Sequence, residues 1–245
     1  MPTVDVSESV HVHYDVEGRL DGFPVLLIAP GGMHSHNALW NDAAWNPRVA
    51  LADEYRLIGM DQRNAGASVA PVRGSDSWAT FAADQIALLD NLGIERCHAL
   101  GMCIGGPYVL ALLAAAPARF ESAVLLQPAG VANDPSMLRG MFDQWAAASA
   151  AAHPETSPTD WASFGDNMWD GDFVLSVTRD EVAACTNPIL VMMGNDGYHP
   201  QSVSREIVAL AQNATLVERW KDAEMLPVTD ATIKTFFAEH TPAAD

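Results

Sequence analysis

Short, continuous apolar runs recur along this sequence and alternate with stretches of helical periodicity. A continuous apolar run is typical of a strand that is buried on both faces, as the strands of a parallel sheet are. These runs, each followed by glycine, proline, aspartate or glutamine, cover residues 25–29, 56–60, 97–100, 123–126 and 189–193. Helical patterns at residues 78–92 and 107–116 lie between them. Strands joined by such helices predict an α/β fold with a doubly wound, mostly parallel sheet.

The two ends of the chain add further elements to this sheet. Residues 10–14 alternate between apolar and polar side chains, which predicts an antiparallel edge strand. Residues 214–218 predict the last strand, and residues 231–238 predict the final helix. A length of 245 residues is within the range of one α/β domain, so we expect residues 1–245 to form a single domain.

The segment at residues 131–184 breaks the rhythm of strands and helices. It contains Trp145, Trp161 and Trp169 among helical and polar stretches, but no clear buried strand. In an open parallel sheet the ligand crevice lies outside the carboxyl ends of the strands, so an insertion after the strand at 123–126 would roof it. We interpret residues 131–184 as an inserted, small helical cap. An ordinary peripheral helical excursion is the alternative.

Composition excludes several classes of partner. Aspartate and glutamate total 31 against 13 lysines and arginines, and the formal charge of −18 repels phosphate polyanions. We therefore expect a small-molecule substrate and neither nucleic acid nor a membrane as partner, while a homodimer stays open. The first residues have no basic region followed by an apolar run, and no later stretch approaches the roughly 20 apolar residues of a membrane span. These features predict a cytoplasmic protein.

One strand-to-helix junction carries a chemical motif. Residues 97–106 read Cys-His-Ala-Leu-Gly-Met-Cys-Ile-Gly-Gly, which contains the pattern G-x-C-x-G around Cys103. This pattern is similar to the nucleophile elbow of the α/β-hydrolases, in which flanking glycines permit a sharp, strained turn. The resemblance implies the α/β-hydrolase fold, with Cys103 in place of the usual serine. Because a helix N-terminus favours negative charge, we expect Cys103 to be partly thiolate. The alternative is a small cysteine packed under a helix.

Other landmarks of the same family occur in the same order. Residues 30–33, Pro-Gly-Gly-Met, follow the first buried strand, where the family carries a His-Gly loop that donates one backbone N–H to the oxyanion hole. The resemblance implies that the amide of Gly32, or of Met33, and that of Ile104 bind a substrate oxygen. The acid of the family's triad follows the strand at 189–193, which implies that Asp196 is the acid.

A turn that is also typical of the family follows the strand at 56–60. Residues 61–68, Asp-Gln-Arg-Asn-Ala-Gly-Ala-Ser, are similar to the family's D-x-R-x-x-G-x-S turn. We expect Asp61 and Arg63 of this turn to pair with each other in a structural role.

The histidine of the family's triad is missing from its usual loop. Residues 219–227, which follow the last predicted strand, contain no histidine, and His240 lies beyond the final helix near the end of the chain. The remaining candidate for the base is His199, three residues after Asp196. Its alternative role is that of a loop histidine that orders the turn at 198–200.

Four further side chains are candidates to contact a substrate. His34 and His36 follow the loop of the presumed oxyanion hole, and Trp145 and Trp169 belong to the presumed cap. Tryptophan is also a common packing residue, so the indoles point only weakly to an apolar or aromatic substrate.

No metal or organic cofactor is expected. The pair His34-x-His36, and the pair His11 and His13 on one strand face, lack further ligands at a recognised spacing. Three cysteines without a C-x-x-C pair suggest neither a disulfide framework nor a zinc site. No dinucleotide fingerprint follows the first strands, and no loop ends in Gly-Lys-Ser/Thr. His98 lies inside a buried strand and is expected to be a satisfied core residue.

Three functions therefore stay open. The first is hydrolysis of a small ester, thioester or lactone, with Cys103 as the nucleophile and backbone amides as the oxyanion hole. The second is a lyase or isomerase that uses the same amides to stabilise an enolate, because a fold does not determine a reaction. The third is a non-catalytic relative that binds a ligand.

Overall fold

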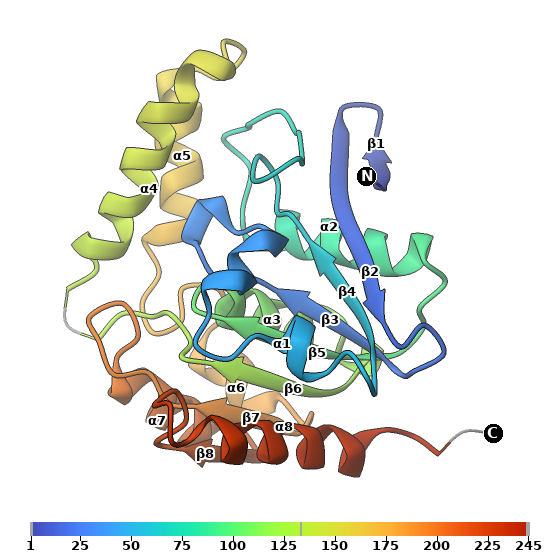
Figure 1. Ribbon diagram of the computed structural model, residues 1–245. Helices are drawn as coiled ribbons and strands as arrows, with labels where there is room; N and C mark the ends of the chain where they lie inside the picture. Colours follow the sequence, from blue (N-terminus) through green and yellow to red (C-terminus); the bar gives the residue numbers. More distant parts are fainter. Residues whose placement is uncertain (1, 133, 244–245) are drawn as a thin grey trace.

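Eight strands form one sheet with helices on both faces (Figure 1). The computed structural model describes residues 2–132 and 134–243. The strands are β1 (Thr3–Ser7), β2 (Val10–Gly18), β3 (Pro24–Ile28), β4 (Arg56–Met60), β5 (Cys97–Met102), β6 (Phe120–Leu126), β7 (Ile189–Met192) and β8 (Ala214–Val217). The α-helices are α1 (Pro47–Ala50), α2 (Trp78–Asn91), α3 (Gly105–Ala115), α4 (Ser136–Ser149), α5 (Pro158–Trp169), α6 (Arg179–Ala184), α7 (Gln201–Leu210) and α8 (Leu226–His240). Short 3₁₀ turns are η1 (Gly32–His34), η2 (Asn37–Asp42), η3 (Pro117–Arg119) and η4 (Ala150–Ala152).

The strands lie in the order β1-β2-β4-β3-β5-β6-β7-β8. All pairs from β4–β3 to β7–β8 are parallel, which confirms the doubly wound, mostly parallel sheet. The position predicted for the strand at residues 10–14 is wrong. These residues belong to β2, which pairs antiparallel with β1 on one side and with β4 on the other. The edge strand is β1, whose Val4 lies opposite Val12 and is buried against it.

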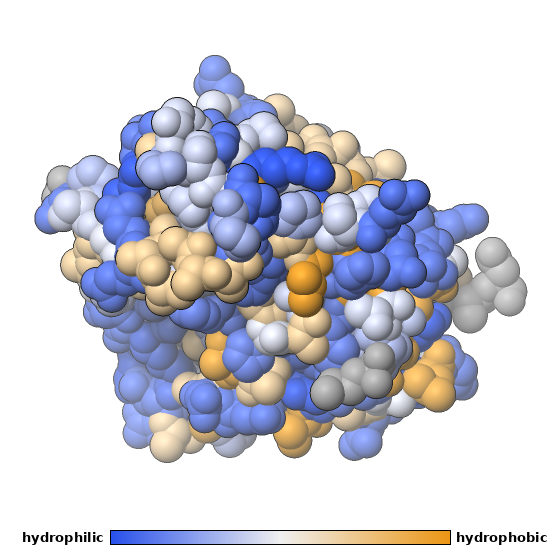
Figure 2. Space-filling view, turned by 90° about the horizontal axis from the view of Figure 1, so that it is seen from above, coloured by the Kyte–Doolittle hydropathy of each residue, from blue (hydrophilic) through white to orange (hydrophobic). Residues whose placement is uncertain are grey.

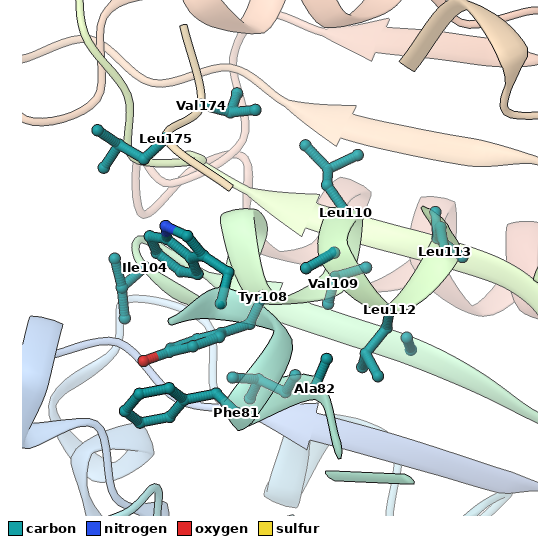
Figure 3. Packing of buried hydrophobic residues seen from close by; sticks show 14 of the residues in the cluster. Phe81, Ala82, Ile104, Tyr108, Val109, Leu110, Leu112, Leu113, Val174 and Leu175 are labelled. Carbon is teal, nitrogen blue, oxygen red and sulfur yellow. The ribbon is translucent and has the colours of Figure 1, made fainter. Parts of the chain in front are cut away.

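The sheet separates two hydrophobic cores. Side chains of α2, α3 and α7 lie in one core, and those of α8 lie in the other, together with Trp40 of η2. Every residue of β5 is buried, as expected for a central strand. Helix α3 is also buried along most of its length: Figure 3 shows Tyr108 beside Phe81 of α2, with Val109 and Leu112 along the same helix. These contacts fix the beginning of α3 at the edge of the sheet.

The carboxyl ends of the parallel strands meet at one edge. Ile28 of β3 lies opposite Gly101 of β5, and Met102 lies opposite Leu126 of β6. Leu126 in turn lies opposite Met192 of β7. The loops that follow β3, β5, β6 and β7 are therefore neighbours, as in other open α/β sheets, where this edge holds the ligand crevice.

Three helices, α4, α5 and α6, lie between β6 and β7, and no strand occurs among the described residues of this segment. Helices α4 and α5 lie side by side beyond the sheet (Figure 1). Aromatic side chains join them: the ring of Phe142 meets that of Phe164 edge-on with centroids 5.2 Å apart. The face seen in Figure 2 is mostly hydrophilic, with apolar residues in small separate patches. In the part of the chain that is described, no helix is both long and apolar enough to cross a membrane.

The turn at residues 61–68 corrects another prediction, because Asp61 and Arg63 do not pair with each other. The carboxylate of Asp61 accepts backbone hydrogen bonds from Asn37 (2.8 Å) and Ala67 (2.9 Å), and it lies 3.0 Å from Nδ1 of His13. Arg63 pairs with Asp84 of α2 instead. The carboxylate of Asp61 thus interacts with two backbone amides and with His13 of β2, while Arg63 pairs with a residue of α2.

Candidate active site

Cys103 occupies a sharp turn between β5 and α3. Its φ of 58° lies in the left-handed region, which costs a residue with a side chain about 1–2 kcal/mol. The turn needs glycines: a Cβ at Gly101 would lie 2.1 Å from the carbonyl oxygen of Gly105, and a Cβ at Gly105 would lie 2.3 Å from that of Ile28. The amide of Cys103 donates to the carbonyl of Leu126 at 3.0 Å. The backbone at Cys103 is therefore fixed by contacts to both neighbouring strands.

The three cysteines differ in their surroundings. Cys97 is fully buried, and burial raises the pKa of its thiol to about 12. Burial also raises the pKa of Cys185, which is partly exposed. Cys103 is partly exposed as well, but it lies at the N-terminal end of α3, where unpaired N–H groups favour an anion. A hollow of about 610 Å³ lies elsewhere, between β7, β8 and α8, and Cys103 does not line it.

Asp196 and His199 form a pair in the loop that follows β7. Nδ1 of His199 donates to the carboxylate of Asp196, 2.8 Å from Oδ1 and 2.9 Å from Oδ2. The backbone amides of Tyr198 and His199 also donate to Oδ1 of Asp196, each at 3.0 Å. The loop folds back tightly, because a Cβ at Gly194 would lie 2.2 Å from the carbonyl oxygen of His199. One turn of chain thus holds both the carboxylate and the imidazole.

The imidazole of His199 interacts with Cys103 as well as with Asp196. Burial alone would lower the pKa of His199, but the side chains of Cys103 and Asp196 outweigh it through hydrogen bonding and charge, so this pKa is raised. Burial alone would raise the pKa of Asp196, but its hydrogen bonds and its attraction to His199 outweigh burial and lower it. The structure therefore brings together Cys103, His199 and Asp196.

The contact between Cys103 and His199 is not a regular hydrogen bond. Nε2 of His199 is buried and has no hydrogen-bond partner of regular geometry among the described residues. The side chain of Cys103 nevertheless lies close enough to raise the pKa of the imidazole. Catalytic hydrogen bonds are often long or poorly aligned until a substrate binds.

Backbone amides of two loops lie near the same edge of the sheet. Gly32, with a φ of 60°, and Met33 begin the turn η1 after β3, and both are buried. Ile104 follows Cys103 directly and is also buried. No acceptor for the amides of Gly32, Met33 or Ile104 is found among residues 2–132 and 134–243. Free amides at this position can receive an anionic oxygen.

Two methionines of α4 lie over the loops of the site. Cε of Met141 lies 3.7 Å from the position that a Cβ would take at Gly32. Cε of Met137 lies 3.0 Å from the corresponding position at Gly197, between Asp196 and His199. The two thioethers are one helical turn apart, so one face of α4 covers both loops. Sequence reasoning missed these residues, although their spacing of four was the available signal.

Comparison with known proteins decides the family. The sequence profile of the alpha/beta hydrolase fold matches residues 24–167, which is more than half of the chain. The chain belongs to the α/β-hydrolase fold family. Among solved structures, this chain resembles a hydrolase from Pseudomonas aeruginosa PA01, with a TM-score of 0.73 and 20% identity over 96% of this chain and 97% of that chain. The enol-lactonase from Burkholderia xenovorans LB400 gives a TM-score of 0.72 and 20% identity over 97% and 100%. At such identities the likeness shows the fold alone.

Two curated relatives match a shorter part of the chain than the family profile does. A protein provisionally named carbamate hydrolase RutD, from Variovorax paradoxus (strain S110), is 35% identical over 117 residues, which are 47% of this chain and 41% of that protein. The carboxylesterase YbfK from Bacillus subtilis (strain 168) is 30% identical over 102 residues, 41% of this chain and 34% of that protein. The chain thus spans about two fifths of the length of the curated relatives it matches.

Two of the four candidate substrate contacts follow β3, and the other two belong to helices α4 and α5. His34 is exposed, and His36 is partly buried against Gly66. Trp145 and Trp169 are buried among aromatic neighbours, and packing accounts for their positions. A role of any of these four side chains in substrate binding stays a prediction.

Three other histidines of the chain contact polar side chains outside the candidate site. His98 is fully buried, with Ser122 at 2.9 Å from Nδ1 and Thr241 at 2.9 Å from Nε2, which confirms it as a satisfied core residue. Burial lowers its pKa to about 3. His11 and His13 lie beside different carboxylates, those of Asp5 and Asp61. Within the described ranges, no three His, Cys, Asp or Glu side chains are grouped so as to hold a metal ion.

Proposed function

We propose that this α/β-hydrolase is a cysteine hydrolase that cleaves a small ester, thioester or lactone. Cys103 is the nucleophile, His199 is the general base and Asp196 orients the imidazole. The observation that carries the proposal is that one imidazole interacts with a carboxylate through Nδ1 and with the thiol of an elbow cysteine. A nucleophile beside a base that a third group orients is the arrangement of covalent acyl transfer.

The reaction follows from these positions. Cys103, as thiolate, attacks the carbonyl carbon, and the amides of Ile104 and of Gly32 or Met33 hold the oxygen of the tetrahedral intermediate. The carbon–oxygen or carbon–sulfur bond to the leaving group breaks, and the leaving alcohol or thiol takes the proton of protonated His199. Neutral His199 then removes a proton from water, which attacks the acyl-cysteine. The acid is released and the thiolate is regenerated.

The proposed base comes from an unusual loop. In the family the histidine follows the last strand, but after β8 the chain carries Trp220, which is buried and donates from Nε1 to the carbonyl of Met193 at 2.9 Å. His199 follows the preceding strand, β7, and is on the same turn as the acid. The names of the relatives, a carboxylesterase and a carbamate hydrolase, support the hydrolytic class for this chain.

We further propose that the helical segment at residues 131–184 acts as the cap over this site. The contacts of Met137 and Met141 of α4 with the two loops support this role. Methionine is flexible and polarisable, so a pair of thioethers can adapt to an apolar acyl group.

The experiment is mass spectrometry of the protein after reaction with p-nitrophenyl acetate. The proposal expects an acetyl group on Cys103, slow release of it in His199→Gln, and a fall in turnover of about 10²–10⁴-fold in that variant. Cys185→Ser is the matched control, because Cys185 is also partly exposed but lies outside the elbow; it should leave acylation unchanged. If Cys103 acquires no acetyl group, the protein is not a cysteine hydrolase. If wild-type protein acquires the group and never releases it, hydrolysis is contradicted.

A further inference from the structure

Lys221, in the loop after β8, has a contact that the proposed reaction does not use. Its Nζ donates to Oε1 of Gln127 at 2.7 Å. Gln127 follows β6, is buried, and adopts a φ of 39°, in the left-handed region. The backbone amide of Gln127 donates to the carbonyl of Met192 at 2.8 Å. A neutral amide thus holds the ammonium group in place without neutralising its charge.

The charge of Lys221 is uncompensated in a carboxylate-rich loop. No carboxylate within the described ranges lies within 4.0 Å of its Nζ, although the chain has 31 acidic residues against 13 basic ones. The neighbouring carboxylates are engaged elsewhere: Arg219 binds Asp222 and Glu224, and Arg205 binds Glu218. The other lysine, Lys234, binds Asp230 at 2.9 Å.

Lys221 reaches the edge of the sheet where Cys103 lies. The amide of Cys103 donates to the carbonyl of Leu126, and Gln127 is the next residue. Gln127 and Cys103 therefore follow paired positions on adjacent strands, which are about 4.8 Å apart. The loop of Lys221 is also the one from which the family's histidine usually reaches the nucleophile. A cation at this place can contact a substrate bound to Cys103.

We propose that Lys221, held by Gln127, binds a carboxylate of the substrate, so that the preferred substrates are anionic esters, thioesters or lactones. This inference rests on the proposed function for the identity of the reacting group. A formal charge of −18 repels a small carboxylate at long range, so such a substrate needs a local cation. An ammonium group paired only with an amide can exchange that contact for a charge-assisted hydrogen bond, which is stronger.

The test compares two reagents that alkylate the same thiol but differ in charge. Iodoacetate carries a carboxylate, and iodoacetamide is neutral. In Lys221→Met the rate of alkylation of Cys103 by iodoacetate, divided by the rate with iodoacetamide, should fall about three- to tenfold at low ionic strength. The iodoacetamide rate itself should not change. The difference should shrink in 1 M NaCl, where the Debye length is about 3 Å. Lys234→Met is the matched control, because it removes a lysine with carboxylate partners; it should leave both rates unchanged.

A substrate pair gives the second readout. The KM of p-nitrophenyl hemisuccinate should rise in Lys221→Met while that of p-nitrophenyl butyrate stays the same, and Lys221→Arg should restore most of the preference. If both alkylation rates fall together, Lys221 acts on the thiolate and the proposal is wrong. If neither the ratio of the alkylation rates nor the KM of the hemisuccinate changes, Lys221 does not contact the substrate.

The outcome separates this inference from the proposed function. If the acyl-cysteine is never released, but iodoacetate still alkylates Cys103 faster in wild type than in Lys221→Met, then hydrolysis is contradicted and the carboxylate site is supported. If Cys103 is inert to both reagents, titration with acetate decides: the NMR signal of the Gln127 side-chain amide should shift in wild type and not in Lys221→Met. No shift in either protein would overturn the site.

Discussion

The strained backbone at Cys103 leads to a prediction about the free energy of unfolding, which does not depend on any reaction. A residue with a Cβ pays about 1–2 kcal/mol for the left-handed conformation seen there, at a φ of 58°. Glycine avoids that cost but loses about 0.5–1 kcal/mol more conformational entropy on folding. Taken at the middle of the two ranges, the difference favours glycine over alanine by about 0.75 kcal/mol at this position. Cys103→Gly should therefore be more stable to unfolding than Cys103→Ala, which reverses the usual order.

The assay is urea or thermal unfolding of the two variants. Both lack Sγ, so the lost packing of the thiol cancels in the comparison, and the midpoint temperatures should differ by about 1–4 °C. Ala114→Gly is the matched control, because Ala114 is exposed in the right-handed backbone of α3, where glycine should be the less stable by about 0.5–1 kcal/mol. If alanine equals or exceeds glycine at position 103, the elbow is not strained and the reasoning from its φ is refuted.

Three further predictions concern charged and buried groups. Asp196→Asn removes a charge that raises the pKa of His199 above 6.5, so NMR titration should give a lower imidazole pKa in the variant than in wild type. An unchanged imidazole pKa would mean that the two groups are uncoupled. Asp84→Ala leaves Arg63 buried without its partner and should cost about 3–5 kcal/mol in urea unfolding, and a loss under 1 kcal/mol would contradict a buried pair. Burial lowers the pKa of His98 from 6.5 to about 3, so between these pH values the unfolded chain takes up a proton that the folded chain does not. The free energy of unfolding should therefore fall from pH 6.5 towards pH 3, and it should fall less in His98→Gln. If its pH dependence is the same in both proteins, another group is responsible.

The parallel part of the sheet could be predicted because its signal is local. A strand buried on both faces must be apolar throughout, and five such runs became β3 to β7. The antiparallel edge could not be placed in the same way. Strand β1 has only five residues, with Val4 buried and Val6 partly buried between exposed polar residues, so its alternation is a short and weak signal. Without β1, the strand at residues 10–14 was wrongly assigned to the edge.

The site was predictable only where topology fixes it. The resemblance to the family implied Cys103 and Asp196 by their positions after β5 and β7, and crossover connections bring the ends of these strands to one edge. Contacts that depend on distant packing gave no local signal. Met141 reaches Gly32 only because α4 crosses the loop after β3, and the pairing of Arg63 with Asp84 depends on the placement of α2.

The position of His199 accounts for the unusual loop after β8. A base that follows the last strand must reach across the edge of the sheet, whereas His199 is held by the same turn as Asp196, with three hydrogen bonds to one carboxylate oxygen. Because the proposed base comes from the loop after β7, the loop after β8 does not have to supply one. Its Trp220 packs into the core and its Lys221 keeps an uncompensated charge beside Gln127. Restoring a histidine at position 220 would therefore cost buried packing, and it should not rescue turnover in His199→Gln.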